Sequence, residues 1–144
     1  MFSKKKVIDM LFISLLLSLV IIISFFNLIS EEQSNENFAG TVLYIIVFAS
    51  AAVIAYVLGE RTVSFFSFGY FVIISLCFCF GFIMELFDLD FGMLSLACSL
   101  LISPFYGFMY ITDHWVAVSF IAALVLCALS AVISFFPRKD HSLE

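Results

Sequence analysis

Charge is scarce in this sequence. Its 144 residues include six Lys or Arg and eleven Asp or Glu, so charged residues make up 12% of the chain. Average soluble domains carry about 25% charged residues, and the hydrophobic share of 65% here is equally far from that norm. The composition therefore excludes a soluble globular domain. The few scattered basic residues also provide no basic face for a nucleic-acid partner.

Residue types that carry catalysis or bind metals are also few. The two histidines, His114 and His141, lie in separate polar segments, and no zinc-ligand spacing surrounds either of them. The four cysteines form no C-x-x-C pair, the usual thiol redox motif. No phosphate-binding G-x-x-x-x-G-K-[ST] and no H-E-x-x-H occurs. We therefore expect a protein that is not an enzyme, with no catalytic residue, no metal site and no cofactor.

Long apolar runs dominate the chain instead. Five of them lie at 7–29, 39–58, 62–84, 91–112 and 115–136, and each is near the roughly 20 residues that a helix needs to cross a bilayer. The first run is longer than the apolar core of a signal peptide, and no A-x-A-like cleavage site follows it. We expect one all-α membrane domain over residues 1–144, a compact bundle of five hydrophobic helices without a soluble domain.

Basic residues indicate the orientation, because Lys and Arg near helix ends stay on the cytoplasmic side. The lysines at 4–6 place the N-terminus in the cytoplasm. The acidic linker 30–37 is then external, the pair at 60–61 cytoplasmic, and the acidic turn 85–90 a solvated external turn.

The pattern leaves two numbers of spans open. Five spans would leave Arg138 and Lys139 outside, whereas four spans would bring all six basic residues inside. Stretch 91–112 is the weakest span, because serines, a proline and a glycine raise its insertion cost. Its full 22-residue length still favours insertion. We expect five spans, with four spans plus one re-entrant segment as the alternative.

Small residues recur every fourth position in the last two stretches and form two ridges. The ridge members are Ser95, Ser99, Ser103 and Gly107 in one stretch and Ser119, Ala123, Cys127 and Ala131 in the other. In lipid, helices associate largely through close contact at such small residues. We expect both ridges to pack against other helices.

Pro104 interrupts the first ridge with a kink. It has no N–H to give the Leu100 carbonyl, so that carbonyl needs a serine hydroxyl, a water or a neighbouring helix. A structural kink is the favoured interpretation. The alternative is a discontinuous helix that exposes carbonyls to a passing ion, but no ionisable residue lies deep in a span to support transport.

Two classes of function remain. We expect a non-catalytic multi-pass protein of the plasma membrane, an accessory, assembly or immunity-type subunit that acts through helix–helix contacts. Its partners would be the lipid bilayer and either its own copies or another membrane protein. The alternative is a small oligomeric channel, holin-like pore or transporter.

The orientation is open to a labelling test. In Ser34→Cys, a membrane-impermeant thiol reagent should react from outside the cell, because the linker at 30–37 is external. Reaction from the cytoplasmic face alone would reverse the assignment. Ser142→Cys in the tail separates the two span counts, since external labelling means five spans and internal labelling means four.

Overall fold

The computed structural model describes residues 4–30, 34–58 and 61–136, and these are helical apart from short turns. The bounds are α1 Lys4–Ile29, α2 Asn35–Leu58, α3 Arg61–Phe87, α4 Met93–Ile102, the 3₁₀ helix η1 Ser103–Tyr110, and α5 Trp115–Phe135. With α4 and η1 taken as one segment, five helices are long and apolar enough to cross a membrane. The expected all-helical class is thus confirmed for the described residues.

The helices extend further into the polar segments than the hydropathy pattern indicates. α2 begins at Asn35, inside the acidic linker, and α3 continues to Phe87, inside the acidic turn. Asn37 occupies the first turn of α2 and is fully buried. Part of the expected linker is therefore a structured helix end that packs against the rest of the bundle.

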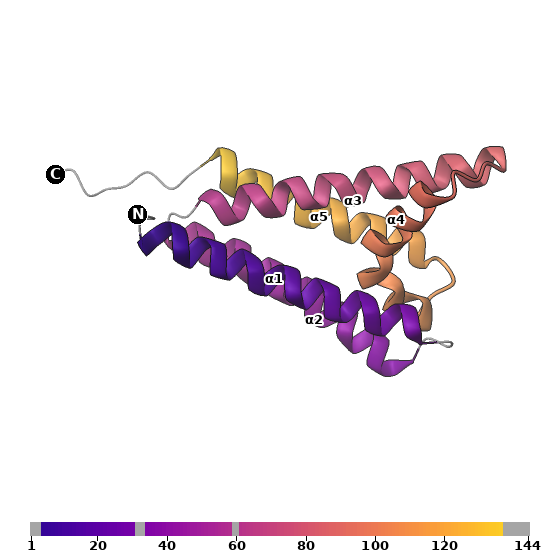
Figure 1. Ribbon diagram of the computed structural model, residues 1–144, viewed down its shortest axis with the longest axis horizontal. Coiled ribbons are helices and arrows are strands. Elements are labelled where there is room, and N and C mark those ends of the chain that lie inside the picture. Colours follow the sequence, from indigo (N-terminus) through magenta and orange to yellow (C-terminus); the bar gives the residue numbers. More distant parts are fainter. Residues whose placement is uncertain (1–3, 31–33, 59–60, 137–144) are drawn as a thin grey trace.

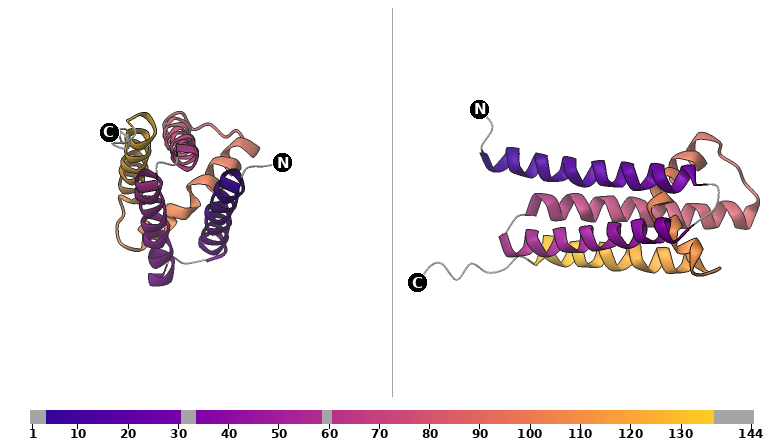
Figure 2. Two further views of the ribbon diagram at one scale, coloured as in Figure 1. Left: turned by 90° about the vertical axis from the view of Figure 1, so that its left-hand side faces the viewer. Right: turned by 90° about the horizontal axis from the view of Figure 1, so that it is seen from below.

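Four helices run along the long axis of the molecule, and the fifth segment does not. α1, α2, α3 and α5 lie lengthwise, whereas α4 and η1 cross the bundle at one end (Figures 1 and 2). α3 ends and α5 begins at that same end. In the view of Figure 1, the α1–α2 pair and the α3–α5 pair diverge toward it, and α4–η1 lies between them.

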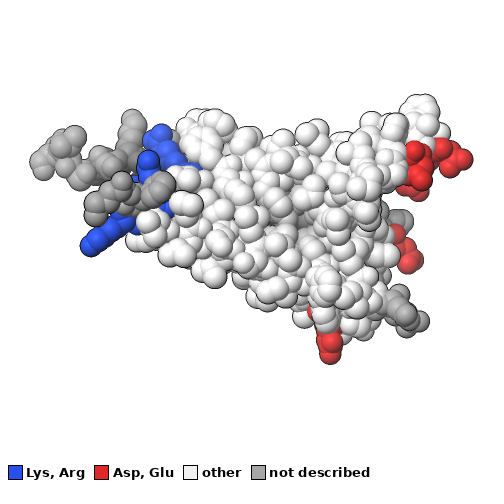
Figure 3. All heavy atoms as spheres, viewed as in Figure 1, with Lys and Arg blue, Asp and Glu red and all other residues white. Residues whose placement is uncertain are grey.

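Charge is separated between the two ends of the bundle. In Figure 3, Lys and Arg gather at the end where α1 begins, and Asp and Glu gather at the opposite end, where α4–η1 crosses. These are called the basic and the acidic end below. Asp9, in the second turn of α1, differs from this pattern because it lies near the basic end and is only 9% exposed.

An aromatic cluster ties η1 into the core. Phe105 is fully buried, and its ring lies 5.3 Å from that of Tyr44 in α2 and 5.9 Å from that of Phe78 in α3. Phe48 and Phe71 continue the cluster between α2 and α3 with a ring distance of 5.0 Å. Tilted and edge-to-face ring pairs of this kind add packing energy beyond their area. The crossing segment is therefore part of the core of the fold.

The most extensive contact in the bundle joins α3 and α5. Ser119 and Ala123 of the second ridge are fully buried, while Cys127 and Ala131 are half-buried. Near the end of α5, the Ser130 carbonyl and the Ser134 hydroxyl form hydrogen bonds with α3. The Ser64 hydroxyl donates to the Ser130 carbonyl at 3.0 Å and accepts from Ser134 at 3.1 Å. Small side chains let these helices approach closely enough for such bonds to form.

Candidate functional site

The helix break at Pro104 is the most polar place inside the bundle. α4 ends at Ile102, and the chain continues as a 3₁₀ helix from Ser103 with Pro104 in its first turn. The Ser103 hydroxyl donates to the Leu100 carbonyl at 2.6 Å. That carbonyl is the one for which Pro104 has no N–H. The hydroxyl of the first residue of η1 thus supplies the partner, and a serine hydroxyl is one of the three solutions expected from the sequence.

The next carbonyls along the chain are bound by side chains from α1 and α2. The Asn27 amide of α1 donates to the Ser103 carbonyl at 2.9 Å and to the Pro104 carbonyl at 3.4 Å. The Thr41 hydroxyl of α2 also donates to the Pro104 carbonyl, at 2.7 Å, and accepts from the Gly107 N–H at 3.1 Å. One threonine therefore pairs two backbone groups of η1.

Asn37 connects the two helices that hold the break. Its side-chain N–H groups donate to the side-chain oxygen of Asn27 and to the Ser30 hydroxyl, both at 3.0 Å. Its own carbonyl oxygen accepts from the Ser34 N–H at 3.0 Å and from the Ser34 hydroxyl at 2.8 Å. The same side chain therefore stabilises the start of α2 and orients Asn27. We call Asn27, Asn37 and Thr41, with the backbone of 103–107, the polar joint.

The polar joint is buried and carries no charge. Asn27 is 1% exposed, and Asn37, Thr41 and Ser103 are not exposed at all. The Leu100, Ser103 and Pro104 carbonyls at the break each accept a hydrogen bond from a side chain. An arrangement of this kind holds elements together and leaves these three carbonyls paired within the protein.

Gly107 allows η1 to reach α2. A β-carbon built on Gly107 would overlap the backbone carbonyl of Asn37 and the hydroxyl of Thr41. Only a residue without a side chain permits this approach. The Gly107 N–H can therefore reach Thr41 directly. The last two residues of the first ridge, Ser103 and Gly107, thus lie against α1 and α2.

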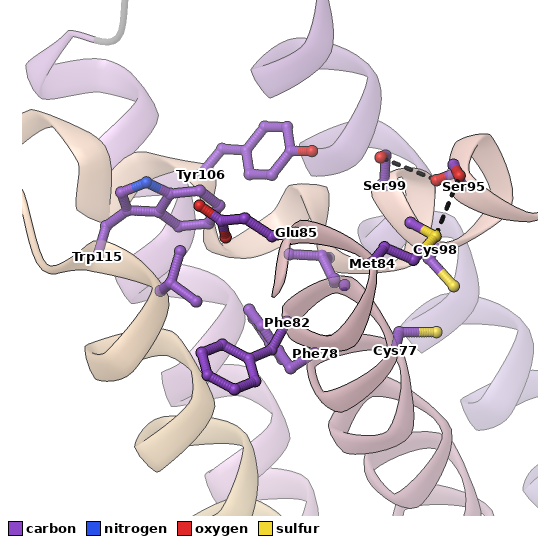
Figure 4. A pocket seen from close by; sticks show the side chains of 13 residues that line it. Cys77, Phe78, Phe82, Met84, Glu85, Ser95, Cys98, Ser99, Tyr106 and Trp115 are labelled. Atoms are coloured by element: carbon purple, nitrogen blue, oxygen red, sulfur yellow. Dashed lines mark hydrogen bonds between the residues drawn. The ribbon is translucent and has the colours of Figure 1, made fainter. Parts of the chain in front are cut away.

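The first two residues of the first ridge, Ser95 and Ser99, have different surroundings. Ser95 and Ser99 line a pocket of about 240 Å³ between α3, α4, η1 and the start of α5 (Figure 4). Ser99 donates to the Ser95 carbonyl of its own helix at 2.9 Å. The Ser95 hydroxyl also donates to the Met84 sulfur of α3 at 3.5 Å. The first two residues of the ridge therefore lie against α3 and the pocket, whereas Ser103 and Gly107 lie against α1 and α2.

The described residues form no metal-binding cluster and no disulfide. Among residues 4–30, 34–58 and 61–136, no three His, Cys, Asp or Glu side chains are grouped to hold a metal ion. His114 is exposed beside the start of α5, and His141 lies outside the described residues. Cys77 and Cys98 are free thiols that line the same pocket.

Sequence reasoning missed the three side chains that form the polar joint. Asn27 and Asn37 stand on either side of the acidic linker, and that placement was the available signal. Two amides near the facing ends of consecutive apolar helices meet when the helices pack as a hairpin. Thr41 carried no signal of its own, since threonine is common in membrane helices.

Removing the Thr41 hydroxyl should destabilise the protein. In Thr41→Val the shape is kept, but the Pro104 carbonyl and the Gly107 N–H lose a buried partner. We expect a loss of about 1–2 kcal/mol, the scale of hydrogen bonds within membrane proteins and of unpaired buried groups. Thermal unfolding in detergent measures it, with the exposed Thr62→Val as control. Equal melting temperatures in the two variants would contradict the assignment.

Adding one methyl group at Gly107 should push η1 away from α2. Gly107→Ala creates an overlap with backbone atoms that cannot rotate away, so we expect a loss of about 1–3 kcal/mol, as in overpacked cores. Gly69→Ala is the matched control, because a β-carbon there meets nothing within 4 Å. The control variant should be as stable as the parent or slightly more so. A harmless Gly107→Ala would mean that η1 does not pack on α2 as described.

Comparison with known proteins assigns this geometry to no family. No family model matches the chain, and no curated protein and no solved structure is significantly similar to it. The chemistry of the polar joint and of the neighbouring pocket therefore rests on the residues of this chain.

Proposed function

We propose that this chain is a non-catalytic multi-pass membrane protein that acts by contact, as an accessory, assembly or immunity-type subunit. Its partner is another membrane protein or further copies of itself. The observation that carries the proposal is the pairing of backbone carbonyls within the polar joint. The carbonyls freed at the helix break, which were the best candidates for a permeation path, are bound by Asn27 and Thr41.

The outer surface supports action by contact. α1 presents large apolar side chains on its outer face, among them Ile8, Leu15, Ile21 and Phe25, each more than 60% exposed. α5 adds Ile121 and Val125 with similar exposure. In a bilayer such faces meet lipid or another helix.

We also propose a topology of four spans with α4–η1 as a re-entrant segment that enters from the external, acidic side. Two observations favour this alternative over five spans. α4–η1 crosses the bundle at the acidic end, and α3 ends where α5 begins (Figure 1). The described end of α5 then lies at the basic end, with Arg138 two residues beyond Phe136. All six basic residues would thereby share the cytoplasmic side.

Reconstitution separates this function from the channel alternative. Liposomes that hold only the purified protein should release an entrapped dye or potassium no faster than protein-free liposomes. Chemical cross-linking in native membranes should instead give complexes of defined size. Steady flux, lost in Ser99→Ala at unchanged thermal stability, would overturn the proposal in favour of a pore. In the labelling test, Ser142→Cys should react from the cytoplasmic side.

A further inference from the structure

The pocket beside α4 has a mixed lining. Phe78 and Ile102 are apolar, while Ser99, Glu85 and the rings of Tyr106 and Trp115 bring polar and aromatic groups to it. In Figure 4 the Glu85 carboxylate points to the side of the pocket where Trp115 and Tyr106 lie. Helices α3, η1 and α5 thus each contribute one of these three side chains.

The two rings form a fixed pair. Tyr106 and Trp115 lie 5.4 Å apart, centroid to centroid, at an interplanar angle of 84°. Both side chains are half-buried, so parts of their surfaces remain open to the pocket. In an edge-to-face pair the edge of one ring meets the face of the other, so each ring keeps at least one face that its partner does not cover. Aromatic faces attract organic cations, with Trp the strongest of the three aromatic types.

Glu85 supplies a negative charge that has no ion-pair partner among the described residues. The described Lys and Arg residues, 4–6 and 61, lie at the opposite end of the bundle, and no described residue donates a hydrogen bond to Glu85. A carboxylate and two aromatic rings that line one pocket are a combination that suits a positive guest. The carboxylate also repels anions, so it disfavours a phosphate or carboxylate group in contact with it.

The size of the pocket limits the guest. A volume of about 240 Å³ is below the range of roughly 300–1,000 Å³ that drug-sized ligands occupy. It accommodates a small head group, with an attached apolar chain leaving along the helix surfaces. We propose that this pocket binds an organic ammonium group on an apolar carrier, with the charge between Glu85, Trp115 and Tyr106. This inference is independent of the function proposed above.

Trp115 provides a direct readout, since it is the only tryptophan in the chain. The full-length protein in an uncharged sugar detergent is titrated with octyltrimethylammonium, and its intrinsic fluorescence is recorded. Saturable quenching or a spectral shift is expected. Octanol and octyl sulfate, with the same chain length but no positive charge, should give no saturable response. Equal responses to all three amphiphiles would overturn the proposal.

A matched pair of variants tests the role of the carboxylate. Glu85→Gln should weaken octyltrimethylammonium binding about tenfold or more, the ratio that corresponds to about 1.4 kcal/mol. Asp88→Asn removes a charge from the same acidic turn but from outside the pocket, and it should bind like the parent. Glu85 is exposed, so both variants are expected to fold, which helical circular dichroism checks. Equal affinity of Glu85→Gln and Asp88→Asn would overturn the assignment.

Competition identifies where the ammonium group comes from. Phosphatidylethanolamine added to the micelles should displace octyltrimethylammonium if a lipid head group is the natural guest, whereas phosphatidylglycerol should not. If soluble ethanolamine competes and the lipid does not, the guest is a free amine. Displacement by phosphatidylglycerol as strong as that by phosphatidylethanolamine would contradict recognition of an ammonium group.

Discussion

Backbone groups inside a bilayer have no water to bind, so every break in a helix must be satisfied by the protein itself. This constraint determines the acidic end of the molecule. The helix breaks at Pro104, where Ser103 binds the Leu100 carbonyl before it and Asn27 and Thr41 bind the Ser103 and Pro104 carbonyls. The way α4–η1 crosses the bundle between the two helix pairs depends on this local solution.

The choice of side chains in the polar joint follows from the same constraint. An amide carries both donors and an acceptor, so Asn37 bonds to α1 through its nitrogen and to the start of its own helix through its oxygen. Neutral groups avoid the high cost of a charge in hydrocarbon. Asn27 and Asn37 also lie close to helix ends, where the path to the membrane surface is short. One connected network thus holds α1, α2 and η1.

Composition and periodicity were enough to predict the helical class and the five apolar segments. The position of Pro104 was enough to predict that the Leu100 carbonyl needs another hydrogen-bond donor. They did not reveal that Asn27 and Asn37 meet, because a side-chain pair across a turn depends on how two helices pack. Likewise, the spacing of Ser95, Ser99, Ser103 and Gly107 marks one continuous line on a helix. The change to 3₁₀ geometry at Ser103 turns that line, so its first half faces a pocket and its second half faces α2. Which neighbour each half of the ridge meets depends on tertiary structure, so the spacing alone does not predict it.

The divergence of the helix pairs gives the molecule a taper, narrow at the basic end and wide at the acidic end (Figures 1 and 3). With the long helices along the membrane normal, the protein occupies a larger area in one leaflet than in the other. Lipids in the two leaflets then feel unequal lateral pressure around it. A tapered inclusion of this kind is most stable where the bilayer bends away on its wide side, so membrane curvature itself would sort the protein within a continuous membrane.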